Sequence, residues 1–244
     1  MLTAAECDAY DGFVRRYQEF LYPLLAVNLL RRVGRMSGKF LDLGVGPGYL
    51  TRELARRATG DIYAADINPA MLKLTDALLR NEELKATVHP MIADVHDLPF
   101  ENKSLDAIVS YSCFHHWADP ARALREIWRT LAAGGCAAII DTEPSSDETL
   151  GALWRLIPDP VHYRFVEEAS AESLPADAVR LIAGKTEAAW RIERFELDEL
   201  DVLACIDDLQ SPPFDEDFPG ANSWILLIEK PGGVDDPQLA HSAS

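Results

Sequence analysis

FLDLGVGPGYLTRELARR, residues 40–57, contains three glycines two positions apart, directly after an apolar segment and directly before an amphipathic one. Glycine costs stability inside regular structure, so Gly44, Gly46 and Gly48 need a compensating reason. The apolar segment predicts a β-strand, and the amphipathic segment predicts a helix. A glycine loop between them lets the backbone approach a ligand closely, because no side chain lies in between.

Short apolar and amphipathic segments alternate between residues 39 and 143. In chain order they are KFLDL, YLTRELARR, DIYAAD, PAMLKLTDALLRN, ATVHPMIAD, LDAIVSY, PARALREIWRTLAA and CAAIIDTE. Such alternation predicts an α/β fold, with a mostly parallel sheet covered by helices on both faces. Two further strands are expected within 189–197 and 223–230.

The chain divides into three predicted parts. Residues 1–36 are expected to form an N-terminal helical cap, and residues 37–230 the main domain. Within that domain, 144–184 reads as a helical and loop insertion near the ligand edge of the sheet. Residues 231–244 have the polar composition that is typical of a disordered tail.

Composition and charge limit the partners and the location. The chain has 244 residues, 40 of them acidic and 23 basic, with a formal charge of −17. This charge repels polyanions, so we expect no nucleic acid as partner. Four cysteines without CxxC spacing, and no secretory leader, predict a reducing, cytoplasmic location. The apolar stretch 20–30 is too short to cross a bilayer, so no membrane association is expected.

A carboxylate at the end of the second predicted strand adds a second ligand signal. Asp66 closes DIYAAD, 18 residues after Gly48, where it can accept hydrogen bonds from both hydroxyls of a ribose. The glycines depart from the dinucleotide pattern GxGxxG, since the third arrives one residue early, and no Walker loop follows. Asp42, two residues before Gly44, disfavours a phosphate and favours an ammonium group. The pattern predicts an adenosine-bearing cofactor with an amino-acid part.

Four motifs together resemble a known family. DLGVGPG, AADINPAML, ADVHDLPF and LDAIVSYSCFHHWADPARALREIWRTLAAGG are similar in order and spacing to class I S-adenosylmethionine-dependent methyltransferases. The resemblance covers roughly residues 38–143, and is to the small-molecule branch that includes ubiquinone-biosynthesis C-methyltransferases. It implies a Rossmann-like seven-stranded sheet whose last strand is antiparallel. It also implies methyl transfer from S-adenosylmethionine to an oxygen, nitrogen or carbon atom of a small-molecule metabolite, with S-adenosylhomocysteine as product.

The resemblance assigns the methionine and ribose contacts to five positions besides Gly44. It implies that Gly46 and Gly48 complete the glycine loop around the methionine part, with Asp42 near the amino group. Backbone at Ser110 would lie near the same amine, and Asp66 would hold the ribose. The alternative for Asp66 is a helix cap, because Asn68 and Pro69 follow it.

The adenine contacts implied by the resemblance lie on the next two motifs. Ile67 and Met71 would flank the ring, Asp94 would accept from its exocyclic amine, and the Val95 amide would meet a ring nitrogen. Met71 is equally well read as a core residue, and Asp94 as part of a turn. Tyr10 and Tyr17 lie on an N-terminal helix that the resemblance implies closes over the cofactor, although packing against the sheet is the alternative.

The segment CFHHWAD, residues 113–119, raises the question of metal binding or catalysis. Adjacent histidines on an extended loop point apart and no second pair has ligand spacing, so no metal is expected. His115 is a candidate general base for the acceptor, with a structural role as the alternative. Asp141 and Glu143 end the fifth predicted strand, where Glu143 is a second candidate base or is simply solvated.

The predicted mechanism is an in-line displacement at an electrophilic methyl group. The protein then has to position the acceptor and exclude water, and a strong base is optional. Two other classes of function stay open: an enzyme that uses the same cofactor for a cyclisation or decarboxylation, and a non-catalytic binding protein of the same fold. We expect a small-molecule acceptor as partner and a monomer or homodimer.

Overall fold

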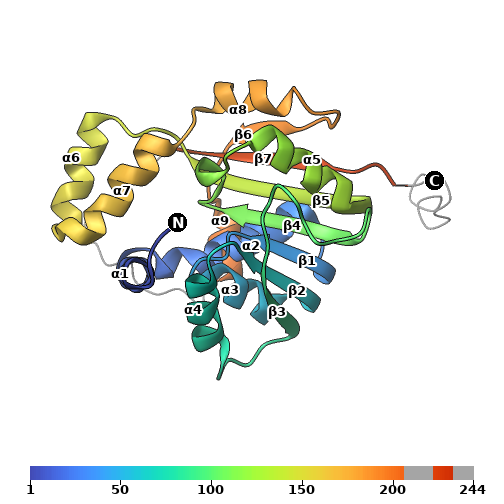
Figure 1. Cartoon of the computed structure of the whole chain (residues 1–244), viewed down its shortest axis with the longest axis horizontal. Helices are drawn as coiled ribbons and strands as arrows, with labels where there is room; N and C mark the ends of the chain where they lie inside the picture. The colour runs from blue at the N-terminus through green and yellow to red at the C-terminus, as the bar shows by residue number, and fades with distance from the viewer. Residues whose placement is uncertain (206–221, 233–244) are drawn as a thin grey trace.

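The computed structural model of the chain describes residues 1–205 and 222–232. In chain order its elements are α1 (Ala4–Tyr17), η1 (Glu19–Leu21), α2 (Tyr22–Val33), β1 (Ser37–Leu43), α3 (Tyr49–Arg57), β2 (Thr59–Asp66), α4 (Pro69–Leu79), β3 (Ala86–Ile92), β4 (Leu105–Tyr111), η2 (Phe114–His116), α5 (Pro120–Thr130), β5 (Leu131–Thr142), α6 (Asp147–Leu156), α7 (Pro160–Glu172), α8 (Ala176–Ala183), β6 (Arg191–Arg194), α9 (Glu199–Ala204) and β7 (Ser223–Glu229). Strands and helices alternate from β1 to β5 as predicted (Figure 1).

The strands form one seven-stranded sheet in the order β3-β2-β1-β4-β5-β7-β6 within the described residues. The pairs β2–β3, β1–β2, β1–β4 and β4–β5 are parallel. β7 runs antiparallel to both of its neighbours, β5 and β6. The expected Rossmann-like sheet with an antiparallel last strand is therefore confirmed, although β6 is shorter than the predicted strand at 189–197.

Alternation along the central strands separates two apolar layers. Phe40 of β1 packs in the cluster that contains α2 and α3, whereas Leu41 and Leu43 pack in the cluster that contains α5 and α8. Val109 and Ile108 of β4 divide between the same two clusters. Successive side chains of a strand point to opposite faces, so helices cover both faces of the sheet. All five side chains are buried.

The helix α5 begins where the sequence predicts and ends earlier. Asp119 caps its first turn by accepting a hydrogen bond from a backbone N–H group. The predicted helix runs to residue 133, but α5 ends at Thr130. Leu131 is extended and pairs with Leu105, and Lys230 Nζ donates to two carbonyl groups at the helix end. Strand pairing and this side-chain cap replace the last helical turn.

Helices from two distant parts of the chain cover the edge where the parallel strands end. Figure 1 shows α1, α6 and α7 beyond the carboxyl ends of β4 and β5. Tyr10 of α1 packs edge-on against Phe165 of α7, with ring centroids 5.2 Å apart. The predicted parts 1–36 and 144–184 are thus largely helical, and their definition as separate parts stays a prediction. Residues 233–244 of the predicted tail lie outside the described residues.

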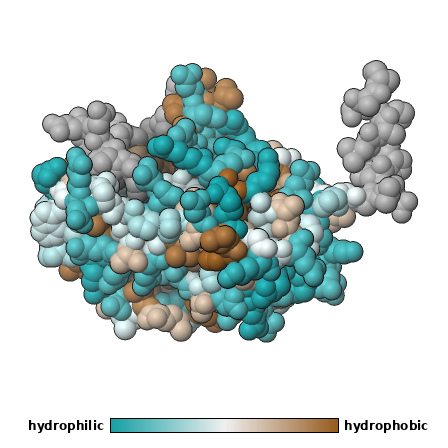
Figure 2. All heavy atoms as spheres, turned by 90° about the horizontal axis from the view of Figure 1, so that it is seen from above, coloured by the Kyte–Doolittle hydropathy of each residue, from teal (hydrophilic) through white to brown (hydrophobic). Residues whose placement is uncertain are grey.

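The surface is mixed in character. The face drawn in Figure 2 is mainly hydrophilic, with small hydrophobic areas between polar ones. Among residues 1–205 and 222–232, no helix is long and apolar enough to cross a membrane.

Candidate active site

The glycine loop connects β1 to α3 through three left-handed residues. Gly44 has φ +73°, and a Cβ atom there would lie 2.1 Å from Cys113 Sγ. Gly48 has φ +96°, and its Cβ would lie 2.8 Å from Thr75 Cγ2. Both separations are shorter than any normal contact, so packing alone requires glycine at these two positions.

Packing does not explain the middle glycine in the same way. Gly46 has φ +54°, and the nearest atom to a Cβ at this position is Tyr10 Cε1, 3.8 Å away. Its carbonyl accepts from Thr75 Oγ1 at 2.9 Å, and its N–H donates to Asp66 Oδ2 at 3.0 Å. At Gly46 a side chain would therefore meet only Tyr10 of α1, at an ordinary contact distance, while Thr75 and Asp66 hold the loop in place.

Asp66 ends β2 directly beside this loop. One carboxylate oxygen accepts from Gly46 and the other accepts from the N–H of Asn68 at 2.8 Å. The cap of α4 is Asn68, whose side chain accepts from Ala70 N, so Asp66 does not fill the capping role. Burial raises the pKa of Asp66 above its ordinary value. A polar group held this way at a strand end is poised for a ligand donor.

Asp42 lies near the carboxyl end of β1, one residue before its last residue, Leu43. Its side chain is 1% exposed, and it accepts from Thr51 Oγ1 of α3 at 2.6 Å. Burial raises its pKa to about 7, and the charge of Asp66 acts in the same direction. A cation beside the loop would favour the ionised form of this carboxyl.

The four predicted adenine contacts differ in exposure. Ile67 is 51% exposed, an unusual state for an isoleucine, whereas Met71 is buried at 6%. Val95 is half-buried. Asp94 is exposed and accepts from both His96 N at 2.9 Å and His96 Nδ1 at 2.6 Å. The hydrogen bond from His96 N lowers the pKa of Asp94, so its carboxylate is already engaged in the turn.

Ser110 and Tyr17 are placed mainly by packing. Ser110 is fully buried in β4, and its hydroxyl donates to the carbonyl of Leu43 at 2.8 Å. Tyr17 packs against Phe13 and is 5% exposed. The aromatic side chain that does reach the glycine loop is Tyr10, about two turns before Tyr17 in α1. Its spacing from Tyr17, seven residues, is the sequence signal for a shared helix face.

The histidine segment after β4 is anchored to the end of β5. His115 N donates to Asp141 Oδ2 at 3.0 Å, and His115 Nδ1 lies 2.9 Å from Asp141 Oδ1. The two side chains are 3% and 1% exposed. Glu143 does not join this pair, because its carboxylate accepts from Ala176 N at the start of α8. Sequence position alone did not indicate which of the two acids meets the histidine.

The second histidine points elsewhere. His116 Nδ1 lies 2.9 Å from Glu172 Oε2 of α7, and both side chains are more than half exposed. His115, His116 and Glu172 each offer one potential metal-ligating atom, all within 4.8 Å of one another. The two adjacent histidines therefore come closer together than expected from an extended loop, with ring centroids 4.0 Å apart. The reason is that both histidines belong to the tight turn η2 and not to an extended segment.

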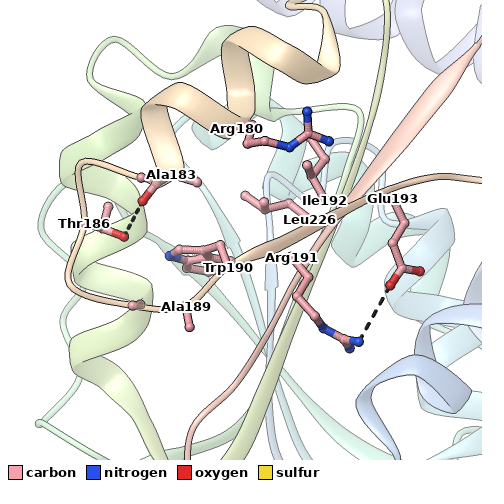
Figure 3. Close-up of a pocket in the computed structure, with 11 residues that line it drawn as sticks. Arg180, Ala183, Thr186, Ala189, Trp190, Arg191, Ile192, Glu193 and Leu226 are labelled. Carbon is pink, nitrogen blue, oxygen red and sulfur yellow. Dashed lines mark hydrogen bonds and ion pairs between the residues drawn. The ribbon is translucent and has the colours of Figure 1, made fainter.

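Two cavities within the described residues lie beside α8, β6 and β7, and the smaller is also lined by Glu143 at the end of β5. The larger, with a volume of about 620 Å³, is bordered by α8, β6 and β7. Figure 3 shows Arg180 of α8 on one side of it and Trp190 and Arg191 on the other. No residue of the glycine loop lines it. The glycine loop is covered by α1 instead, which fills the space in this conformation.

Known proteins resemble the part of the chain that carries this edge. The profile of a family described as methyltransferase domain matches residues 41–139, from β1 to β5. The ubiquinone/menaquinone biosynthesis C-methyltransferase of Idiomarina loihiensis is 34% identical over 122 residues, 49% of this chain and 49% of that protein. The malonyl-acyl-carrier-protein O-methyltransferase of Halorhodospira halophila is 29% identical over 167 residues, 66% of this chain and 56% of that protein.

A solved structure extends the likeness to most of the chain. A SAM-dependent methyltransferase from Aquifex aeolicus superposes with a TM-score of 0.64 over 94% of this chain and 99% of that chain, at 16% identity. This likeness concerns the fold. The chain spans about half the length of the curated relatives that it matches.

Proposed function

We propose that this chain binds S-adenosylmethionine and methylates a small molecule. Its residues 41–139 belong to the methyltransferase domain family, and its fold is that of class I S-adenosylmethionine-dependent methyltransferases. The observation that carries the proposal is the tie between Gly46 and Asp66. It places a stretch of backbone without side chains and a partly buried carboxylate next to each other at the ligand edge of the sheet.

The residues at this edge fit the cofactor by their chemistry. A Cβ at Gly46 would meet only the Tyr10 ring, at an ordinary contact distance of 3.8 Å, so packing does not exclude a side chain here, and a ligand lying against the bare backbone would explain the glycine. Asp66 would accept from the ribose hydroxyls and Asp42 would favour the cationic methionine part through charge. The half-exposed Ile67 would cover one face of the adenine.

The remaining predicted contacts are less direct. Met71, Gly44 and Gly48 support the shape of the pocket by packing. Asp94 would have to exchange a bond with His96 for one with the adenine amine, and Val95 would offer its amide. Ser110 would act through its backbone, because its hydroxyl is engaged within the sheet. Tyr17 would act by holding α1 in place.

The chemistry required of the protein is positional. When bound, the cofactor supplies a methyl group on a positively charged sulfur, which is electrophilic without further activation. The chain has to hold the acceptor in line with it and exclude water. α1 and α7 cover the site, with Tyr10 and Phe165 in contact. His115 and Glu143 are the two side chains proposed as bases.

The proposal also covers the cellular location, the acceptor and the oligomeric state. The four cysteines are free thiols, which supports a reducing compartment such as the cytoplasm. The acceptor is proposed to be a small molecule, and the protein a monomer or homodimer.

A calorimetric titration tests the proposal. We expect both S-adenosylmethionine and S-adenosylhomocysteine to bind, and mass spectrometry to detect S-adenosylhomocysteine when a small-molecule cell extract is added. Binding without release of S-adenosylhomocysteine would indicate a cyclase, a decarboxylase or a binding protein. Absence of binding would contradict the proposal.

A further inference from the structure

We propose that Asp141 is the positioning residue that makes His115 the general base for the methyl acceptor, with Nε2 as the atom that takes the proton. The inference rests on the proposed function, since it concerns the acceptor side of the same site. It also selects His115 over Glu143 and defines the kind of acceptor that the site serves.

Asp141 anchors His115 through both its backbone and its ring. It lies at the carboxyl end of β5, and its side chain is 1% exposed. Its carboxylate accepts three N–H groups: His115 N at 3.0 Å, Thr142 N at 2.7 Å and His115 Nδ1 at 2.9 Å. Two of the three come from His115, so the backbone and the ring of this residue are fixed by the same carboxylate. A ring held at two points has little freedom to turn.

This arrangement selects the tautomer of His115. A carboxylate only accepts, so Nδ1 carries the proton and Nε2 carries the lone pair. Nε2 makes no hydrogen bond with any group in the described parts of the chain. The His115 side chain is 3% exposed, so bulk water has little access to it. Nε2 is therefore a basic nitrogen that is free to accept a proton, as in a histidine base that is oriented by a carboxylate.

The pair lies directly beside the glycine loop. Cys113, two residues before His115, has its sulfur where a side chain at Gly44 would be. The η2 turn that carries His115 also contacts α7, one of the helices that cover the site. The turn that carries His115 is thus close to the glycine loop and is covered by α7.

Neighbouring groups are poorer bases. Burial raises the pKa of Cys113 to about 12 and that of Tyr111 to about 12, so both stay protonated at neutral pH. Glu143 is engaged with the first N–H group of α8. His116 is mostly exposed and is paired with Glu172. His115 is the group that is covered, oriented and unoccupied at once.

A base of this kind serves an acceptor whose reacting atom carries a proton, either a hydroxyl or an acidic C–H group. Nε2 takes that proton, and the electron pair left on oxygen or carbon forms the bond to the methyl carbon. The carbon–sulfur bond breaks and its electron pair stays on sulfur, which becomes a neutral thioether. The imidazolium that results is stabilised by the Asp141 carboxylate.

The tautomer can be measured without knowing the acceptor. In the full-length protein with isotopically labelled histidine rings, nuclear magnetic resonance should show His115 protonated at Nδ1 and not at Nε2. Asp141→Asn should shift His115 toward the other tautomer, because an amide can donate to Nδ1 as well as accept from it. The control is Asp61→Asn, which alters a separate aspartate–histidine pair with His89. An Nε2–H tautomer in the wild type would overturn the inference.

A transfer assay tests the chemistry. With S-adenosylmethionine labelled in its methyl group and a small-molecule cell extract as acceptor, we expect Asp141→Asn and His115→Gln each to lower the label transfer roughly 100-fold or more. Titration with S-adenosylhomocysteine should change less than about threefold, since the loss is in turnover and not in binding. Asp61→Asn should keep the wild-type rate.

The outcomes separate the two proposals. If the wild type binds no cofactor or transfers no label, the proposed function fails, and the tautomer still reports whether Asp141 positions His115. If the wild type transfers label and Asp141→Asn does so equally fast, the inference fails alone. If both EDTA and Glu172→Gln abolish the transfer, His115 acts as a metal ligand together with His116 and the inference is overturned.

Discussion

The N–H of Gly46 donates to Asp66 Oδ2 across 3.0 Å, so the open residue of the glycine loop is bonded to the last carboxylate of the neighbouring strand. The bond links two features that a ligand would use together. A ribose diol that binds Asp66 meets a carboxylate that is already fixed in direction, which limits the entropy lost on binding.

We therefore expect Asp66→Ala to weaken the binding of both S-adenosylmethionine and S-adenosylhomocysteine. Hydrogen bonds to a charged group contribute roughly 1.5–3 kcal/mol, which corresponds to an affinity loss of roughly 10- to 100-fold. Calorimetric titration measures it. Asp61→Ala is the control, because Asp61 lies in the same strand and is half-exposed. Equal affinities for wild type and Asp66→Ala would remove Asp66 from the site.

The open position above Gly46 gives a second test. Gly46→Ala should fold, since its Cβ meets only Tyr10 at 3.8 Å, at a cost of about 1–2 kcal/mol for the left-handed backbone. It should lose cofactor binding, because the methyl group takes the space of the ligand. Gly34→Ala is matched: Gly34 has φ +65° and nothing within 4 Å of its Cβ. Both variants should lower the melting temperature similarly, and only Gly46→Ala should lose binding.

A Gly46→Ala variant that binds the cofactor with wild-type affinity would contradict the proposed position of the ligand. Gly44→Ala is not a suitable substitute, because the clash with Cys113 would confuse misfolding with loss of binding.

The buried Asp42 predicts a pH dependence of stability. Burial raises its pKa to about 7, whereas the carboxyl of the unfolded chain has the ordinary pKa of 3.8. The folded state thus keeps a proton that the unfolded state has lost, and the stability from this group is fully present below about pH 4 and lost as the pH rises to about 7. Asp42→Asn does not titrate, so its stability relative to wild type should increase with pH, by on the order of 4 kcal/mol.

Urea unfolding of both proteins at about pH 4.5 and about pH 8 measures this difference. Thr51→Val serves as a control that removes the hydroxyl donor and keeps the carboxyl. A stability gap between Asp42→Asn and wild type that does not change with pH would show that Asp42 titrates normally in the folded state.

The sequence predicts features that depend on local pattern. The glycine loop and Asp66 are set by residues that follow one another along a strand, a turn and a helix, so their relation could be expected. The mostly parallel sheet up to β5 follows from the same alternation, whereas its seven strands and antiparallel last strand were implied by the family resemblance. The predicted end of α5 was wrong by three residues. Pairing of Leu131 with Leu105 ends the helix, and Leu105 is distant from it in the chain.

Contacts between distant segments were harder to predict. Asp141 and Glu143 differ by two positions at the end of one strand, and only the bend after β5 decides that Asp141 meets His115 while Glu143 meets α8. Tyr10 and Tyr17 were equally hard to tell apart, because both are tyrosines on the same helix. Which of them reaches the glycine loop depends on how α1 is docked, and docking has no signature within α1 itself.

The docking of α1 on α7 contains an unsatisfied group that gives the last prediction. His162 of α7 packs against Phe13 and Tyr17 of α1, and its Nδ1 is buried with no hydrogen-bond partner in the described residues. A buried polar group without a partner costs roughly 1–3 kcal/mol. His162→Phe keeps the ring among aromatic neighbours and removes that cost, so we expect a gain of about 1 kcal/mol and a melting temperature higher by about 2–4 °C. His89→Phe, at a half-exposed histidine paired with Asp61, should give no such gain. A loss of stability in His162→Phe would mean that Nδ1 is satisfied in solution, by water or by the carboxylate of Asp159 at 3.9 Å.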